Sequence, residues 1–117
     1  MRDHRKLEVF HLADSLALLV YRATQGFPRE EMFGLTAQMR RSAVSVAANI
    51  VEGCARHGER DYSRFLDLSF GSLREVGYFI DLAARLNYLP GDVADDLRTI
   101  QSRTAAALAA LLRARGR

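Results

Sequence analysis

The sequence has few of the residues on which several protein classes depend. Its 117 residues include one cysteine, two prolines and no tryptophan. One cysteine cannot form a disulfide framework or a cysteine-rich zinc site. The longest apolar run free of charge, Thr104 to Leu112, has nine residues, whereas a helix that spans a bilayer needs about 20. We therefore expect neither a membrane anchor nor a signal peptide. We expect the protein to be located in the cytoplasm.

Histidine is equally sparse. The three histidines, His4, His11 and His57, make no i, i+3 or i, i+4 pair, and no HExxH or Glu-x-x-His motif occurs. Helical metal proteins place several carboxylates in the core with histidines beside them. We therefore expect no metal and no other cofactor. The single thiol, Cys54, is expected to be a buried packing residue.

The residues that are abundant favour helices. Alanine and leucine, both strong helix formers, supply 33 residues, and strand-like alternation is absent over any useful length. Apolar residues at helical spacing predict four helices, over about residues 7–24, 36–55, 59–86 and 92–114. The connections are short, so the simplest fold is all-α, an antiparallel up-down-up-down four-helix bundle formed by residues 1–117 as one domain.

Local signals set the ends of these helices. The Phe27-Pro28 step ends the first helix, because a residue before proline is disfavoured in the α region. Thr36 is the expected N-cap of the second helix, and Asn87 the expected stop of the third. Gly71 lies in the middle of the third helix, where glycine costs about 1 kcal/mol relative to alanine. It marks either a close helix approach or sequence drift.

The third helix has the most regular pattern. One heptad-like stripe is predicted to face the core, and it consists of Tyr62, Leu66, Ser69, Leu73, Val76, Ile80 and Ala83. A second stripe runs beside it through Phe65, Leu68, Ser72, Phe79, Leu82 and Leu86. Glu75 occupies the remaining heptad position of this second stripe. A buried carboxylate requires a partner, so we expect Glu75 to form a buried ion pair with Arg40 of the second helix.

Basic residues gather near the two ends of the chain. The formal net charge is +3, but residues 98–117 carry five arginines and no acidic residue. Residues 7–97 carry nine basic and thirteen acidic residues. A basic tail can contact phosphates, because each neutralised phosphate releases a counterion. A solvated, frayed C-terminus also explains these charges, so the charge alone permits nucleic-acid binding without indicating it.

Polar stripes on the second and third helices contain the candidate binding residues. Arg41, Ser45, Asn49, Glu52 and Arg56 follow one another at helical spacing, and Arg60 and Arg64 begin a similar stripe on the third helix. Such stripes are either solvated faces with internal ion pairs, subunit interfaces, or phosphate-contacting surfaces. We expect Arg41, Arg56, Arg60 and Arg64 to contact phosphates, and Asn49 and Glu52 to orient them or to lie in a subunit interface.

Arg5 and His11 permit one catalytic hypothesis. Their R-x(4–6)-H spacing resembles the motif of helical HEPN ribonucleases, in which Arg and His act at the ribose hydroxyl and the scissile phosphate. So loose a pattern arises readily by chance in an arginine-rich chain, and no other feature of those enzymes accompanies it. We therefore expect no catalytic residue and no enzymatic activity.

Longer stretches of the sequence resemble a known family. The runs that carry the resemblance are FGLTAQMRRSAVSVAANIVEGCAR at 33–56, LEVF at 7–10, VYRATQGFP at 20–28, FLDLSFGSLREV at 65–76 and LNYL at 86–89. Together they resemble the four-helix-bundle family encoded by intervening sequences within bacterial 23S ribosomal RNA genes, also called the S23 ribosomal protein family. Phe10, Ala47 and Cys54 replace residues more usual in that family, and all three are packing changes.

The resemblance implies a homo-oligomer, with a homopentamer expected. The family is also similar to the accessory variability proteins of retroelements, which form pentameric barrels and associate with nucleic acid and a reverse transcriptase. The resemblance thus favours a non-enzymatic protein that binds RNA or DNA through arginine-rich surfaces. The alternative is a structural or adaptor oligomer that docks a partner protein and binds no nucleic acid.

Overall fold

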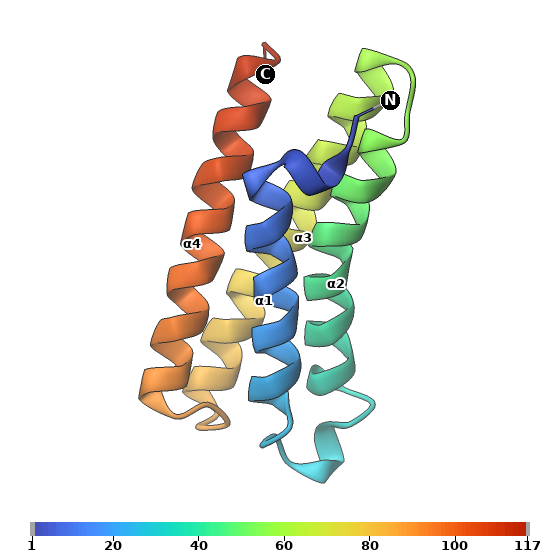
Figure 1. The fold of residues 1–117 in the computed structure, drawn as a ribbon. Coiled ribbons are helices and arrows are strands. Elements are labelled where there is room, and N and C mark those ends of the chain that lie inside the picture. The colour runs from blue at the N-terminus through green and yellow to red at the C-terminus, as the bar shows by residue number, and fades with distance from the viewer. Residues whose placement is uncertain (1, 117) are drawn as a thin grey trace.

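Four long helices form the protein (Figure 1). The computed structural model describes residues 2–116. Two single-turn 3-10 helices, η1 (His4–Lys6) and η2 (Arg29–Glu31), accompany α1 (Glu8–Thr24), α2 (Leu35–Cys54), α3 (Glu59–Arg85) and α4 (Gly91–Ala114). No strand occurs in this part of the chain. The four predicted helices are confirmed, each with bounds within one residue of those expected.

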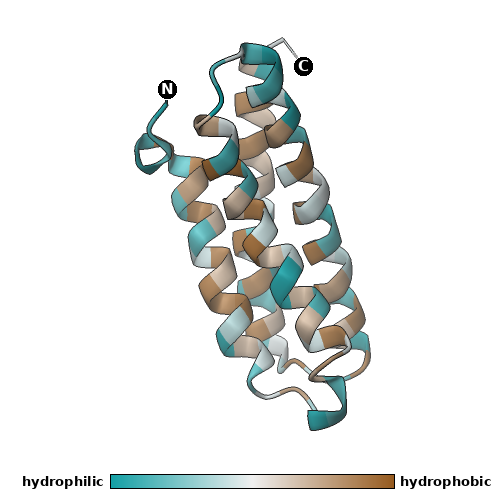
Figure 2. Cartoon of the chain, turned by 90° about the vertical axis from the view of Figure 1, so that its right-hand side faces the viewer, coloured by the Kyte–Doolittle hydropathy of each residue, from teal (hydrophilic) through white to brown (hydrophobic). Residues whose placement is uncertain are grey.

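The helices pack around a single elongated core. α1 and α3 each pack against both α2 and α4, and α2 contacts α3 most extensively. The molecule measures 43 × 24 × 21 Å. Hydrophobic and hydrophilic segments alternate along each helix, as the helical period requires (Figure 2). None of the described helices is long and apolar enough to cross a membrane.

The regular stripe on α3 faces the core as predicted. All seven of its members are buried: Tyr62, Leu66, Ser69, Leu73, Val76, Ile80 and Ala83. Ser69 is fully buried and donates a hydrogen bond of 2.7 Å to the Val46 carbonyl of α2. The one hydroxyl in the middle of this stripe therefore joins α3 to α2.

The helix ends follow local rules, with one correction. Asn87 has φ of 61° and ends α3, and the Tyr88 amide donates to the Ala83 carbonyl at 2.9 Å, as in a Schellman motif. The prediction of Thr36 as the N-cap of α2 is wrong. The helix begins one residue earlier, and the carboxylate of Glu31 accepts a hydrogen bond of 3.1 Å from the Leu35 amide.

Contacts between segments that are distant in the sequence hold the connections together at each end of the molecule. At one end, the Tyr88 hydroxyl donates to the Glu31 carboxylate at 2.9 Å, and the Tyr88 ring lies 5.4 Å from that of Phe27. At the other end lie the α2–α3 connection and both ends of the described chain (Figure 1). There the Arg2 amide donates to the Cys54 carbonyl at 3.1 Å.

Candidate functional site

Two of the predicted arginines flank one aromatic ring. Arg56 follows α2 and Arg64 lies on α3, and their guanidinium carbons are 4.7 and 4.5 Å from the centroid of the Phe65 ring. Arg56 also pairs with Glu52, and Arg64 pairs with Asp61 at 3.6 Å. The side chains of Arg56 and Arg64 remain 41% and 58% exposed. The ring orients two cations that solvent still reaches.

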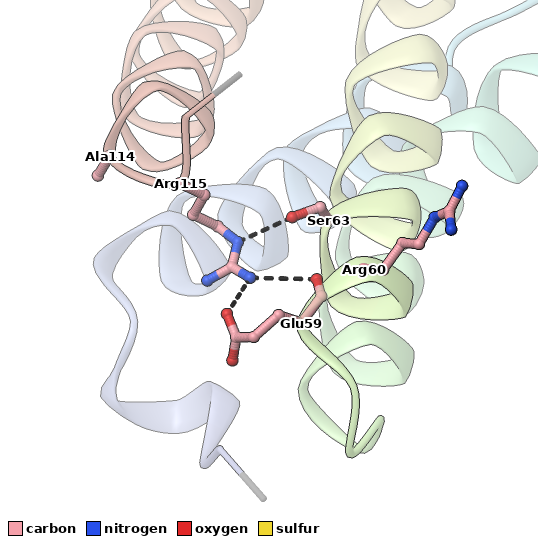
Figure 3. A pocket seen from close by; sticks show the side chains of 5 residues that line it. All are labelled: Glu59, Arg60, Ser63, Ala114 and Arg115. Carbon is pink, nitrogen blue, oxygen red and sulfur yellow. Dashed lines mark hydrogen bonds and ion pairs between the residues drawn. The ribbon is translucent and has the colours of Figure 1, made fainter.

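Arg60 lies one helical turn before Arg64, on the exposed face of α3. It lines a pocket of about 440 Å³ together with Glu59, Ser63, Ala114 and Arg115. Figure 3 shows the Arg60 guanidinium turned away from the hydrogen bonds that Arg115 makes inside the pocket. Arg60 and Arg64 are one helical turn apart on α3, and Arg56 lies with Arg64 over Phe65, so the three arginines lie at the same end of the molecule.

A cluster that we call the terminal clasp holds this end together. It consists of Arg2, Glu59, Tyr62 and Arg115. Arg115 donates to the Ser63 hydroxyl at 3.0 Å and to the Glu59 carbonyl at 3.2 Å, and both Arg115 and Arg2 pair with the Glu59 carboxylate. The two guanidinium carbons lie 4.2 and 3.8 Å from the Tyr62 ring centroid.

One carboxylate dominates the electrostatics of the clasp. Hydrogen bonds from Arg115 and then Arg2 lower the pKa of Glu59, and burial raises the pKa of Tyr62. The clasp cations are therefore engaged with an anion of the same chain. Residue spacing in the sequence does not reveal this cluster, because its ion pairs join residues 56 and 57 positions apart. No local pattern relates residues at such a separation.

Arg41 lies apart from the other three candidates. It is 15 positions before Arg56, which is about 22 Å along a helix at 1.5 Å per residue. It lines a different pocket, of about 290 Å³, between α2 and α3 with Gln38, Ser42, Ser45, Ser72, Glu75 and Phe79. The four predicted phosphate contacts therefore do not form one continuous cluster.

Asn49 and Glu52 have local partners. The Asn49 amide donates to the Ser45 carbonyl and hydroxyl, both at 2.9 Å, and the Ser45 hydroxyl lies 2.8 Å from that of Ser72. Glu52 pairs with Arg56, which is the contact that an orienting role requires. A role for either residue in a subunit interface stays a prediction.

The predicted buried ion pair between Arg40 and Glu75 is wrong. Arg40 donates to the Thr24 hydroxyl at 2.8 Å and to the Tyr21 carbonyl at 3.3 Å, and its guanidinium carbon lies 4.7 Å from the Tyr21 ring centroid. Glu75 is exposed and accepts a hydrogen bond of 3.1 Å from Ser42. The cause is geometric: Arg40 lies on the flank of α2 that faces α1, whereas Glu75 lies along the α2–α3 seam.

The remaining sequence candidates also have partners close by. The Arg5 guanidinium pairs with Asp3, and an imidazole nitrogen of His11 lies 2.7 Å from the Arg5 carbonyl. Cys54 is buried, and burial raises the pKa of its thiol. Within residues 2–116, no group of three or more His, Cys, Asp or Glu residues could hold a metal ion. Arg117, a member of the basic tail, lies outside the described residues.

The whole helical pattern matches one protein family. A family model described as 23S rRNA-intervening sequence protein matches residues 5–110. The chain belongs to this family. None of the curated proteins matches the chain.

This member of the 23S rRNA-intervening sequence family shares its fold with a solved structure. That structure is a protein of unknown function from the S23 ribosomal protein family of Bacteroides thetaiotaomicron VPI-5482. The two chains superpose with a TM-score of 0.83 at 19% identity, over 90% of this chain and 95% of the other. The likeness establishes the fold, and the function has to be argued from the surface of this chain.

Proposed function

We propose that this family member is a non-enzymatic homo-oligomer that binds RNA or DNA through the cluster of Arg56, Arg60 and Arg64. The observation that carries the proposal is the pair of solvent-accessible guanidinium groups that lie over the Phe65 ring, with Arg60 one helical turn before Arg64. Exposed arginines form bidentate contacts with phosphate, and an orienting ring lowers the entropy lost on binding.

We further propose an antiparallel up-down-up-down arrangement of the helices, assembly into a homopentamer and action in the cytoplasm. The helical arrangement is supported by the contact of the α1–α2 and α3–α4 connections at one end, through Tyr88 and Glu31. The pentamer is supported by the resemblance to retroelement accessory proteins. Light scattering on the purified protein should give a mass near five times 13.1 kDa.

Charge reversal tests the nucleic-acid site. The double variant Arg56→Glu, Arg60→Glu should bind labelled RNA more weakly than the wild type, whatever the RNA sequence. Two lost phosphate contacts should also reduce the slope of log affinity against log salt by about 1.4 to 1.8. The matched control is Arg22→Glu, Arg29→Glu, which makes the same charge change at two exposed residues away from the cluster. Equal binding by the test variant and the control would contradict the site assignment.

One observation favours the adaptor alternative. Phe33 is 91% exposed and its neighbour Met32 is 51% exposed, and such apolar side chains suit a protein partner. Under this alternative, the protein purified without nuclease gives a protein-like ratio of absorbance at 260 and 280 nm. Arg41→Glu would then change the oligomer mass. A high ratio that falls when salt is added supports nucleic-acid binding instead.

A further inference from the structure

The outer face of α3 carries a line of exposed arginines and apolar side chains, with the acidic residues Asp67, Glu75 and Asp81 among them. Six exposed residues lie on this face, within about a third of the helix circumference: Arg60, Arg64, Leu68, Arg74, Tyr78 and Arg85. From the first to the last, the line extends about 38 Å at 1.5 Å per residue. It begins in the arginine cluster of the proposed function and continues beyond it. Basic residues interleaved with exposed rings and apolar groups are typical of surfaces that follow a single strand.

Tyr78 is the most prominent ring on this face. It is 56% exposed, the largest exposed fraction of any described tyrosine. Its ring contacts Phe79 at a centroid distance of 5.7 Å and a tilt of 56°. A phenol ring fixed on a rigid helix and open to solvent provides a face on which a planar base can stack.

A pocket beside Tyr78 supplies polar groups for the edge of a base. It has a volume of about 500 Å³ and lies between α3 and α4, lined by Arg74, Gly77, Gln101 and Ser102 among others. The Gln101 amide donates to the Leu73 carbonyl at 3.2 Å, and its carbonyl oxygen can accept a further hydrogen bond. A Cβ at position 77 would lie 3.0 Å from the Gln101 amide nitrogen, so glycine allows this side chain to lie against α3.

The charges along this face have few competing carboxylates: Arg64 pairs with the exposed carboxylate of Asp61, at 3.6 Å. Within residues 2–116, Arg60 and Arg74 form no ion pair. Arg98, across the same pocket, is held by Asp81 at 3.2 Å and by Asp95 at 3.8 Å. Phosphate is therefore expected at Arg74 rather than at Arg98.

We infer that the outer face of α3 binds single-stranded nucleic acid, with one base stacked on Tyr78 and phosphates at Arg74, Arg64 and Arg60. The inference rests on the proposed function and narrows the proposed ligand from RNA or DNA in general to a single strand. Bases inside a duplex are stacked on one another and cannot lie flat against a side chain of a straight helix, whereas an unpaired base can.

The test compares two variants of the full chain that each remove one exposed ring. Tyr78→Ala should weaken binding of a fluorescein-labelled single-stranded RNA by about 5- to 150-fold, the range for loss of one stacked base. Its salt dependence should stay that of the wild type, because no phosphate contact is lost. The control Tyr21→Ala removes a tyrosine of α1 that is 44% exposed, and it should bind as the wild type does. Tyr78→Phe keeps the ring and should retain binding.

A second readout isolates the stacking itself. The chain has four tyrosines and no tryptophan, so its intrinsic fluorescence reports tyrosine alone. Unlabelled single-stranded RNA should quench this emission in the wild type, and the quenching should decrease in Tyr78→Phe. Phenylalanine still stacks but does not contribute to tyrosine emission.

Several outcomes would overturn the inference. If the same RNA annealed to its complement binds as tightly as the single strand, and Tyr78→Ala leaves both unchanged, the single-strand assignment fails while the proposed function stands. If the wild type binds neither form, the proposed function fails and the inference fails with it. A changed oligomer mass in Tyr78→Ala at unchanged RNA affinity would assign the ring to a protein contact.

Discussion

Glu59 and Arg115 join the first turn of α3 to the residue that follows α4. Arg115 donates to both the carbonyl and the carboxylate of Glu59, and the Arg115 side chain is only 14% exposed. Arg2 reaches the same carboxylate from the other end of the chain. One acidic side chain at the surface thus organises three segments that are distant in sequence.

This shared carboxylate predicts a specific dependence of stability on pH. The pKa of Glu59 is lower in the folded protein than its ordinary value of 4.5, because Arg115 and Arg2 bind its charged form. A depressed pKa contributes stability that is present above 4.5 and is lost as the pH falls through the folded-state value. Thermal unfolding from pH 7 to pH 3 should show a loss of stability in acid that is smaller in Glu59→Gln. Glu30→Gln controls for the change in net charge, and equal acid sensitivity of all three proteins would contradict the prediction.

Two glycine-to-alanine substitutions should have opposite effects. A Cβ at Gly53 would lie 3.0 Å from the Phe65 Cβ and 3.3 Å from the Tyr62 ring, whereas nothing lies within 4 Å of one at Gly71. Gly53→Ala should lower the free energy of unfolding by about 1–2 kcal/mol through overpacking. Gly71→Ala should raise it by about 1 kcal/mol through helix propensity alone. Urea denaturation measures both, and a stabilising Gly53→Ala would show that α2 and α3 can separate without cost.

Arg40 should be coupled energetically to Thr24 and not to Glu75. The hydrogen bond to Thr24 and the stacking on Tyr21 should make Arg40→Ala destabilising by about 1 kcal/mol. In double-mutant cycles, the pair Arg40→Ala, Thr24→Val should deviate from additivity by about 0.5 kcal/mol or more. The pair Arg40→Ala, Glu75→Ala should be additive within about 0.5 kcal/mol. Coupling found only in the Arg40–Glu75 cycle would contradict the structure and support an ion pair between these two residues.

Cys54 should react slowly with thiol reagents in the folded protein. It is 1% exposed, and burial raises the pKa of its thiol, so little thiolate forms near neutral pH. We expect labelling at least about 100-fold slower in native buffer than in denaturant, because it requires opening of the structure. Arg2→Ala should accelerate native labelling, because it removes the guanidinium that pairs with Glu59 and lies 3.8 Å from the Tyr62 ring centroid, and so loosens the N-terminal segment that covers Cys54. Immediate labelling of the native wild type would contradict this assignment.

Periodicity predicted the helices and the core well, because burial of one helix face follows directly from residue spacing. The same reasoning failed at Glu75. The second stripe on α3 lies at the margin of the core, where burial is uneven, and Phe79 of that stripe is only 9% exposed. Leu68 and Leu86 of that stripe are 46% and 45% exposed, and Glu75 lies at the surface with them.

The candidate site was predictable only where its residues are neighbours along the chain. Arg56, Arg60 and Arg64 follow one another closely, and the structure brings them together. The separation of Arg41 from that cluster, and the terminal clasp, depend on how helices pack across the core. Residue spacing along a single helix shows neither how far Arg41 lies from that cluster nor which segments the terminal clasp joins. Arg40 shows the same limit, because its partner Thr24 belongs to another helix.

The terminal clasp also bears on the kinetics of folding. Its contacts close loops of about 56 residues, and loop closure on that scale costs chain entropy before any contact offsets it. We expect such contacts to form after the local helix pairs and to be absent from the transition state. Loss of the clasp should then leave the folding rate nearly unchanged and increase the unfolding rate. We therefore expect the surface carboxylate of Glu59 to set how long the folded state lasts rather than how quickly it is reached.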